Sequence, residues 1–214
     1  MALYGTLKAA LLFWKKLSES LKLRGFTINP YDWCIANKTI NGKHCTIVWH
    51  VDDLKASHVD AKVNDGFLEW LKKTYGDEEI GKVKAVRGPI HDYLGMTLDF
   101  TKSRVLKLDM SKYIQDMIED FPDDLDGKEE YPWNDKLFKI DENDKKLDKL
   151  KSEEFHTFVA KALFLSKRAR PDIQPGIPFL TTRVKEPGEN DWNKLKWLMN
   201  FLKKTKNDVI GASG

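Results

Sequence analysis

Two adjacent acidic residues, Asp52 and Asp53, offer the clearest candidate chemistry in this 214-residue chain. They interrupt the run Cys45–Val51, whose β-branched and aromatic residues are typical of a strand. A strand interior would bury one of two neighbouring carboxylates, because alternate side chains point to opposite faces. We therefore expect the pair at a tight turn, where two carboxylates can hold divalent metal ions for phosphoryl transfer. An acidic surface turn is the alternative for the dipeptide alone.

The elements that must position this pair follow from the spacing of apolar residues. Helical spacing predicts helices anchored by Leu7–Leu21, Val63–Leu71, Tyr113–Phe121, Phe155–Ser166 and Trp192–Leu202. β-Branched and aromatic runs predict strands at Tyr31–Ala36, Cys45–Val51, Leu54–Ser57, Lys82–Arg87, Tyr93–Phe100 and Val105–Leu108. Asn41-Gly42 is a strong hairpin signal between the first two strands.

Charge is unevenly distributed along the chain, although the formal net charge is only +3. Residues 123–154 carry seven basic and twelve acidic side chains, whereas residues 155–214 carry eleven and five. Few apolar anchors occur in residues 123–150, so we expect a mobile, acidic surface connection there. The basic C-terminal part is what binding to a phosphate backbone needs, and a solvated lysine-rich face is the alternative.

The composition is that of a globular protein without membrane spans or a disulfide framework. Hydrophobic residues make up 41% and charged residues 32%, as in globular proteins that fold around a core. No segment has the roughly 18 apolar residues of a membrane span, so no membrane partner is expected. The two cysteines give no disulfide framework and fit an intracellular compartment, cytoplasmic or nuclear. Zinc ligation by His44, Cys45 and His50 with Cys34 is disfavoured, because alternation places Cys45 and His50 on opposite faces.

Six short segments, in order along the chain, resemble those of one family. They are Leu3-Tyr4-Gly5 with Leu7-Lys8-Ala9-Ala10 and Trp14, His50-Val51-Asp52-Asp53-Leu54, Tyr93-Leu94-Gly95-Met96, Asp109–Ile114, Arg170-Pro171-Asp172-Ile173, and Trp192–Lys196 through Phe201–Thr205. Together they resemble the reverse transcriptase domain of copia-type, Pseudoviridae-like LTR retrotransposon polyproteins. The second is similar to the Tyr-Val-Asp-Asp-Leu box of these enzymes, and the third to their primer-grip hairpin.

The resemblance implies a fold and a reaction. The fold expected is α+β: a partial palm over residues 1–122, an acidic connection over 123–150, and a helical thumb and connection over 151–214. The implied activity is RNA-directed DNA polymerisation, in which a primer 3′-hydroxyl attacks a deoxynucleoside triphosphate with Mg²⁺ or Mn²⁺ as cofactor. The implied partners are an RNA or DNA primer-template, nucleotides and the rest of a retroelement polyprotein, in a cytoplasmic virus-like particle or the nucleus.

Individual roles follow from matched positions. Asp52 and Asp53 would be the catalytic, metal-binding carboxylates. Contacts to the nucleotide and template would come from Tyr4, Gly5, Lys8 and His50. The primer grip would be formed by Leu94, Gly95 and Met96. Contacts to the nucleic-acid backbone would come from Lys167, Arg168, Arg170, Lys203 and Lys204.

The sequence departs from the family pattern at three places. His50 replaces the usual tyrosine, and an imidazole can gain charge near pH 6.5. Thr6 is inserted, and Ala9 replaces the family's glutamine. The family's earlier palm strand, which carries a further catalytic aspartate, its fingers and its ribonuclease H domain have no counterpart here. We therefore expect an incomplete domain, and the alternative function is an inactive remnant that at most binds nucleic acid through residues 155–206.

Overall fold

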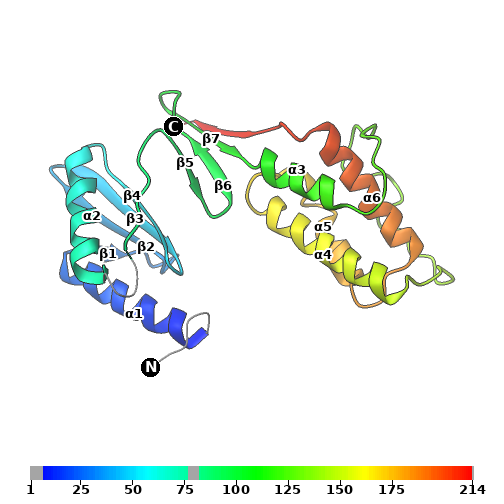
Figure 1. Cartoon of the computed structure of the whole chain (residues 1–214), viewed down its shortest axis with the longest axis horizontal. Coiled ribbons are helices and arrows are strands. Elements are labelled where there is room, and N and C mark those ends of the chain that lie inside the picture. The colour runs from blue at the N-terminus through cyan, green and yellow to red at the C-terminus, as the bar shows by residue number, and fades with distance from the viewer. Residues whose placement is uncertain (1–6, 77–81, 214) are drawn as a thin grey trace. The chain divides into compact units, whose positions relative to one another are not determined.

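The chain divides into two compact units, residues 1–87 and residues 88–214. A computed structural model describes residues 7–76 and 82–213, and each unit has a hydrophobic core of its own. Helices and two antiparallel sheets give an α+β architecture (Figure 1). The division differs from the boundaries expected at residues 122 and 150, because the helix that precedes residue 122 shares one core with all the later helices.

The first unit is a four-stranded antiparallel sheet with two helices on one face. Its elements are α1 (Leu7–Leu23), β1 (Thr27–Ile28), β2 (Ile35–Ile40), β3 (Lys43–His50), β4 (Asp53–Ser57) and α2 (Ala61–Tyr75), with strand order β1-β2-β3-β4. Leu17 and Leu21 of α1 and Phe67 of α2 share a core with Ile47 and Trp49 of β3. Both helices therefore cover the face of the sheet to which Ile47 and Trp49 point, and neither helix covers the opposite face, here called the open face.

Tight turns fix the register of this sheet. Asn41 and Gly42 both have positive φ values, 52° and 71°, and join β2 to β3 as the hairpin signal predicted. At the end of α1, the amide of Phe26 donates to the carbonyl of Leu21 and that of Gly25 to Lys22. This pattern is a Schellman motif, which needs the positive φ that Gly25 adopts.

Two of the expected strands in this unit are wrong or displaced. The segment Tyr31–Ala36 becomes a strand only from Ile35, because the Asp32 carboxylate accepts the amide of Cys34 and holds a turn there. Lys82–Arg87 forms no strand and pairs with none of the strands in the described part of the chain. Its apolar residues alone do not make a strand where no neighbouring strand accepts its backbone hydrogen bonds.

The second unit combines a four-stranded meander with a helical bundle. Its elements are β5 (Ile90–Tyr93), β6 (Met96–Asp99), β7 (Val105–Asp109), α3 (Ser111–Asp120), α4 (Lys149–Ser166), the 3₁₀ helix η1 (Pro171–Ile173), α5 (Ile177–Arg183), α6 (Glu189–Lys204) and β8 (Ile210–Ser213). The strand expected over Tyr93–Phe100 is interrupted, because Leu94 and Gly95 make a turn between β5 and β6. Strand β8 returns to pair with β7 and is an element that apolar periodicity does not predict.

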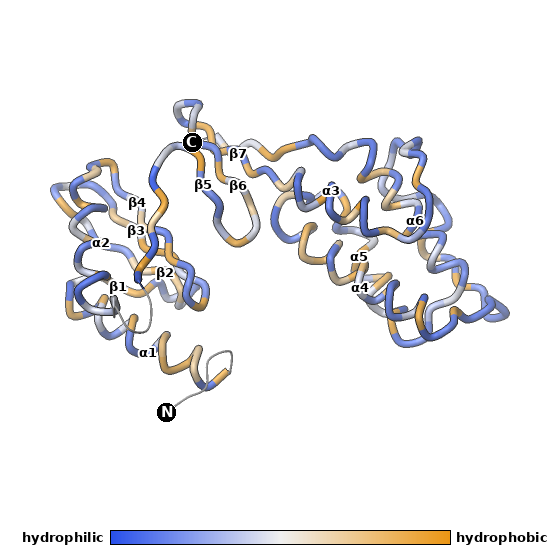
Figure 2. Tube along the Cα trace, in the orientation of Figure 1, coloured by the Kyte–Doolittle hydropathy of each residue, from blue (hydrophilic) through white to orange (hydrophobic). Residues whose placement is uncertain are grey.

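The bundle is held by one apolar core. Phe155 and Leu165 of α4 are fully buried with Ile177 of α5 and Leu195 and Leu198 of α6. Hydrophobic and hydrophilic positions alternate along the helices in Figure 2, as expected for helices that bury one side. None of the described helices is long and apolar enough to cross a membrane.

Residues 123–148, here called the strap, connect α3 to α4 and are held against the bundle. Apart from an isolated bridge between Lys146 and Gly188, the strap has no regular strand or helix. Leu137 is nevertheless only 4% exposed, and the Trp133 indole donates to the carbonyl of Ile173 at 3.2 Å. The expectation of a mobile connection is therefore corrected, because these contacts anchor the strap.

Candidate functional site

The two adjacent acids lie at the turn that joins β3 to β4. His50 and Asp53 form the last residue pair of the hairpin, so Val51 and Asp52 make a two-residue turn between them. Val51 has a φ of 54°, in the left-handed region that β-branched residues rarely enter. His50, Asp52 and Asp53 are all exposed. The structure thus places both carboxylates at a tight, solvent-facing turn.

Alternation along β3 explains why this turn is polar. Ile47 and Trp49 point into the core, so His50 lies on the open face of the sheet. Asp53 is directly opposite His50 and shares that face, and Lys55 follows two residues later on the same side. The open face of the hairpin therefore carries an imidazole, a carboxylate and an amine.

Lys55 is a candidate that motif matching misses. Burial lowers the pKa of its amine, and the amine lies 3.0 Å from the hydroxyl of Ser57. A cation on the same face as Asp53 could contact the anionic groups of a substrate. The signal in the sequence is only its position, two residues after Asp53 in a strand with period two.

Carboxylates are the type of ligand that a hard divalent cation takes. Mg²⁺ prefers oxygen ligands and commonly binds through one or two protein carboxylates together with substrate phosphates. Within residues 7–76 and 82–213, no group of three or more His, Cys, Asp or Glu side chains is placed to hold a metal ion. Asp52 and Asp53 would thus supply part of the ligand set for Mg²⁺ or Mn²⁺. The zinc alternative gains no support, because Cys45 is 1% exposed in the core whereas His50 lies on the open face.

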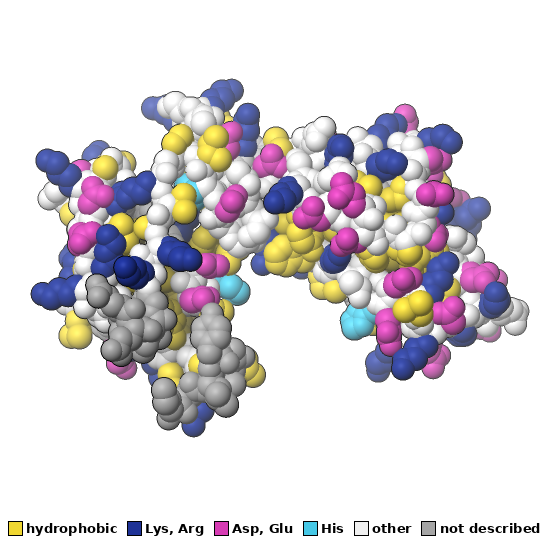
Figure 3. All heavy atoms as spheres, in the orientation of Figure 1, with side chains coloured by type: hydrophobic (Ala, Val, Ile, Leu, Met, Phe, Trp, Pro, Cys, Tyr) yellow, Lys and Arg dark blue, Asp and Glu magenta, His cyan; other side chains and the backbone are white. Residues whose placement is uncertain are grey.

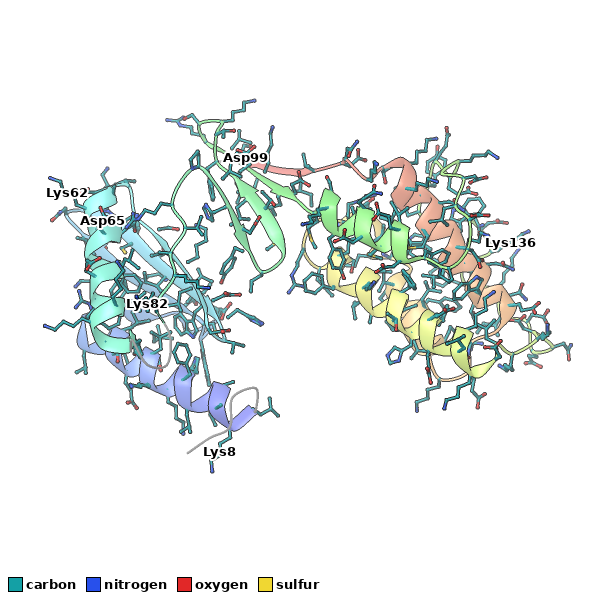
Figure 4. The ribbon with its side chains drawn as sticks, viewed as in Figure 1. Lys8, Lys62, Asp65, Lys82, Asp99 and Lys136 are labelled. Carbon is teal, nitrogen blue, oxygen red and sulfur yellow. The ribbon has the colours of Figure 1, made fainter. Side chains whose placement is uncertain are left out.

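The residues expected near the nucleotide are only partly described. Tyr4 and Gly5 lie outside the described residues. Lys8 lies in the first turn of α1, where its side chain is exposed (Figure 4). Of the members that the structure describes, His50 lies directly opposite Asp53 in the hairpin.

The expected primer grip is the β5–β6 turn in the second unit. Leu94 and Gly95 have φ values of 52° and 76°, so the turn is a tight one. Met96 packs against the core of the bundle. A Cβ atom on Gly95 would meet the Phe164 ring of α4 at 3.5 Å, so the turn lies against that ring.

The guanidinium of Arg168 packs over the same Phe164 ring. The guanidinium carbon lies 3.6 Å from the ring centroid, and Nη1 donates to the carbonyl of Phe164. Lys167 is exposed at the end of α4. These two cations, which were expected to contact a nucleic-acid backbone, lie next to the helix that holds the β5–β6 turn.

Arg170 does not fit the expected role. Its guanidinium donates to the Asp172 carboxylate and to both the carbonyl and the hydroxyl of Thr205, and the residue is 3% exposed. A buried guanidinium with its donors satisfied inside the protein is a structural group. The prediction that Arg170 contacts nucleic acid is therefore corrected: it ties η1 to the end of α6.

Lys203 and Lys204 are exposed but engaged within the chain. The amine of Lys203 donates to the carbonyl of Leu125 at 2.6 Å, and that of Lys204 lies 3.3 Å from a Glu130 carboxylate oxygen. Both partners belong to the strap. Basic and acidic side chains are interspersed on the face of the second unit that Figure 3 shows.

The chain aligns over its full length with one part of a larger protein. Over 223 positions it is 23% identical to the retrovirus-related Pol polyprotein from transposon TNT 1-94 of Nicotiana tabacum. The chain is thus similar to one part of a retrotransposon Pol polyprotein. The match covers 100% of this chain and 16% of that polyprotein. No family model matches the chain, and no solved structure matches it.

Proposed function

We propose that this chain is the part of a copia-type reverse transcriptase that carries its Asp-Asp turn, its primer grip and its thumb. The observation that carries the proposal is the β3–β4 turn, which holds Asp52 and Asp53 side by side at the exposed end of an antiparallel hairpin. The similarity to a Pol polyprotein supports the same origin. On this proposal the first unit and strands β5 to β7 correspond in sequence to palm segments, and α4 to α6 correspond to the thumb.

The proposed reaction is attack of a primer 3′-hydroxyl on the α-phosphorus of a deoxynucleoside triphosphate, which forms a phosphodiester bond and breaks the α–β phosphoanhydride bond to release pyrophosphate. Bound Mg²⁺ or Mn²⁺ would activate the hydroxyl and stabilise charge on the phosphates. Asp52 and Asp53 would hold the cation, while His50 would pack beside the primer end. Lys55, on the same face, would contact phosphate. The Leu94-Gly95 turn would press on the primer, and Lys167 and Arg168 would contact its backbone.

A second candidate function is a catalytically inactive remnant that only binds nucleic acid. The observation in its favour is the small ligand set, since the described residues contain no group of three His, Cys, Asp or Glu side chains placed to hold a metal ion. Two carboxylates from one turn leave most positions around a pair of octahedral Mg²⁺ ions to other ligands. The remnant would retain the basic residues of the second unit and lack turnover.

Primer extension separates the two functions. If the chain is an active polymerase part, it extends a DNA primer on an RNA template with Mg²⁺ or Mn²⁺. Asp52→Asn should then lower the rate by roughly 100-fold or more, because it removes a metal-binding charge. Glu19→Gln on α1 removes one charge from the same unit and should leave the rate unchanged. Oligonucleotide binding without extension, with either cation, would favour the remnant.

A further inference from the structure

The strap runs along α6 in one direction and then returns along it. Its first part reaches the C-terminal end of the helix, and its second part returns to the N-terminal end. The successive partners are Asp123 with Trp192 and Lys196, Leu125 with Lys203, Glu130 with Lys204, Tyr131 with Trp197, Lys139 with Lys194, and Asp144 with Asn190. Figure 1 shows this segment, between α3 and α4, running beside α6.

Every lysine of α6 gives its amine to an oxygen of the strap. The pairs are Lys194 with the Lys139 carbonyl at 2.7 Å, Lys196 with the Asp123 carboxylate at 3.3 Å, Lys203 with the Leu125 carbonyl at 2.6 Å, and Lys204 with the Glu130 carboxylate at 3.3 Å. Two of these acceptors are carboxylate oxygens and two are carbonyl oxygens, and a phosphate backbone would offer the same amines anionic oxygens in their place. The strap therefore occupies the amines of Lys196, Lys203 and Lys204, which a polyanion would use, whereas the side chain of Lys194 is only 10% exposed and also pairs with Asp191 of its own helix.

The charge of the strap and its anchoring to the bundle both favour its contacts with the lysines of α6. The strap has ten acidic and five basic side chains, opposite in sign to the helix face that it covers. The buried Leu137 and the Trp133 indole hold the strap to the bundle independently of the lysines. The acceptors therefore stay close to α6 at a high effective concentration, even when one lysine contact opens.

We propose that the strap is an autoinhibitory segment that keeps the lysines of α6 from binding nucleic-acid phosphates. The Glu130–Lys204 pair is its weakest point, because the two side chains are 72% and 41% exposed. Asp123 is held more firmly, since its carboxylate also accepts the Trp192 indole at 2.8 Å. Neutralising Glu130 should therefore free Lys204 and leave the rest of the strap in place.

The test is binding of a fluorescent DNA duplex of about 20 base pairs to the full chain across a series of salt concentrations. Glu130→Gln should bind about two- to fivefold more tightly at low salt, with a steeper salt dependence, by about one counterion. Lys204→Ala should leave binding by the otherwise unchanged chain as it was. The same change should abolish the gain in a Glu130→Gln chain.

The control is Glu142→Gln, which removes one negative charge from another part of the strap. If it tightens binding as much as Glu130→Gln, net charge explains the effect and the autoinhibitory role is refuted. Equal binding by Glu130→Gln and the unchanged chain would also refute it. The autoinhibitory role rests on the proposed function, because that function supplies the nucleic acid as ligand. The differences in DNA affinity between the variants test the autoinhibitory role, whereas primer extension tests the proposed function. Thermal unfolding verifies that each variant is folded.

Discussion

Val51 is the residue at which the candidate site departs most from ordinary backbone geometry. A left-handed conformation costs an L-residue roughly 1–2 kcal/mol, and a β-branched side chain adds to the crowding. Val51 is half exposed, so its burial offsets little of that cost. Strained residues of this kind persist where the surrounding structure imposes them, and here the turn brings two carboxylates to one end of a hairpin.

Replacing Val51 with glycine should therefore stabilise the first unit. Glycine adopts the positive φ without a steric cost, and this gain exceeds its additional unfolded-state entropy by roughly 0.5–1 kcal/mol. Val59, which is exposed and has a negative φ, is the matched control, and Val59→Gly should destabilise. Urea unfolding measures both variants. A loss of stability in Val51→Gly as large as that in Val59→Gly would contradict the assignment of strain.

At the scale of elements, Asp123 joins the strap to two residues of α6, Trp192 and Lys196. Burial alone would raise the pKa of this carboxyl, but hydrogen bonds from Trp192 and Lys196, with the charges of Lys196 and Lys151, hold it below its usual value. A depressed pKa in the folded state means that the ionised carboxylate stabilises the fold. This contribution is complete above the ordinary pKa of 3.8 and is lost as the pH falls through the folded value.

Asp123→Asn should consequently lower the free energy of unfolding by about 1 kcal/mol at pH 7. The difference from the unchanged chain should shrink below about pH 4, because protonation then removes the same charge. Urea unfolding at pH 7 and pH 3 gives both values. A difference that stays constant between the two pH values would show that the charge of Asp123 is not what holds the strap. Asp124→Asn, at the exposed neighbouring position, should change stability by less than about 0.5 kcal/mol at either pH.

The sequence predicts those elements whose causes are local. The Asn41-Gly42 hairpin follows from two residues that tolerate positive φ, and the turn at Asp52 follows from the cost of burying two adjacent charges. The strap could not be predicted, because its partners are distant in sequence. Tyr131 is 66 residues from Trp197, and Leu125 is 78 residues from Lys203. Its polar composition alone resembles that of a disordered connection. The structural role of Arg170 could not be predicted for the same reason, since its hydrogen-bond partner Thr205 lies 35 residues further along the chain.

At the scale of the whole molecule, the core of the second unit is built from residues of that unit alone. All the buried members of that core come from residues 110–202, and β8 completes the second sheet from the same unit. The first unit likewise contains both cysteines, of which Cys45 is 1% exposed. Each unit therefore has the composition of a separately folding domain.

A fragment comprising residues 88–214 should fold alone. We expect a helical circular dichroism spectrum and a cooperative urea transition. The full chain should show two transitions, one for each unit, and the midpoint of the fragment should match one of them. The other transition should coincide with the labelling of Cys45 by a thiol reagent, because this buried thiol becomes accessible only when the first unit unfolds. A fragment without cooperative unfolding would show that its core depends on residues 1–87.

The course of the strap also sets the order in which this unit can fold. Lys203 lies 78 residues after the carbonyl that it bonds, and Lys196 lies 73 residues after Asp123. Closing loops of this length carries an entropic cost that must be met before the contacts form, so such contacts form late. A chain emerging from the ribosome exposes its acidic segment long before its lysine partners exist. The strap is therefore expected to be the last part of the second unit to settle, after α4, α5 and α6 have packed.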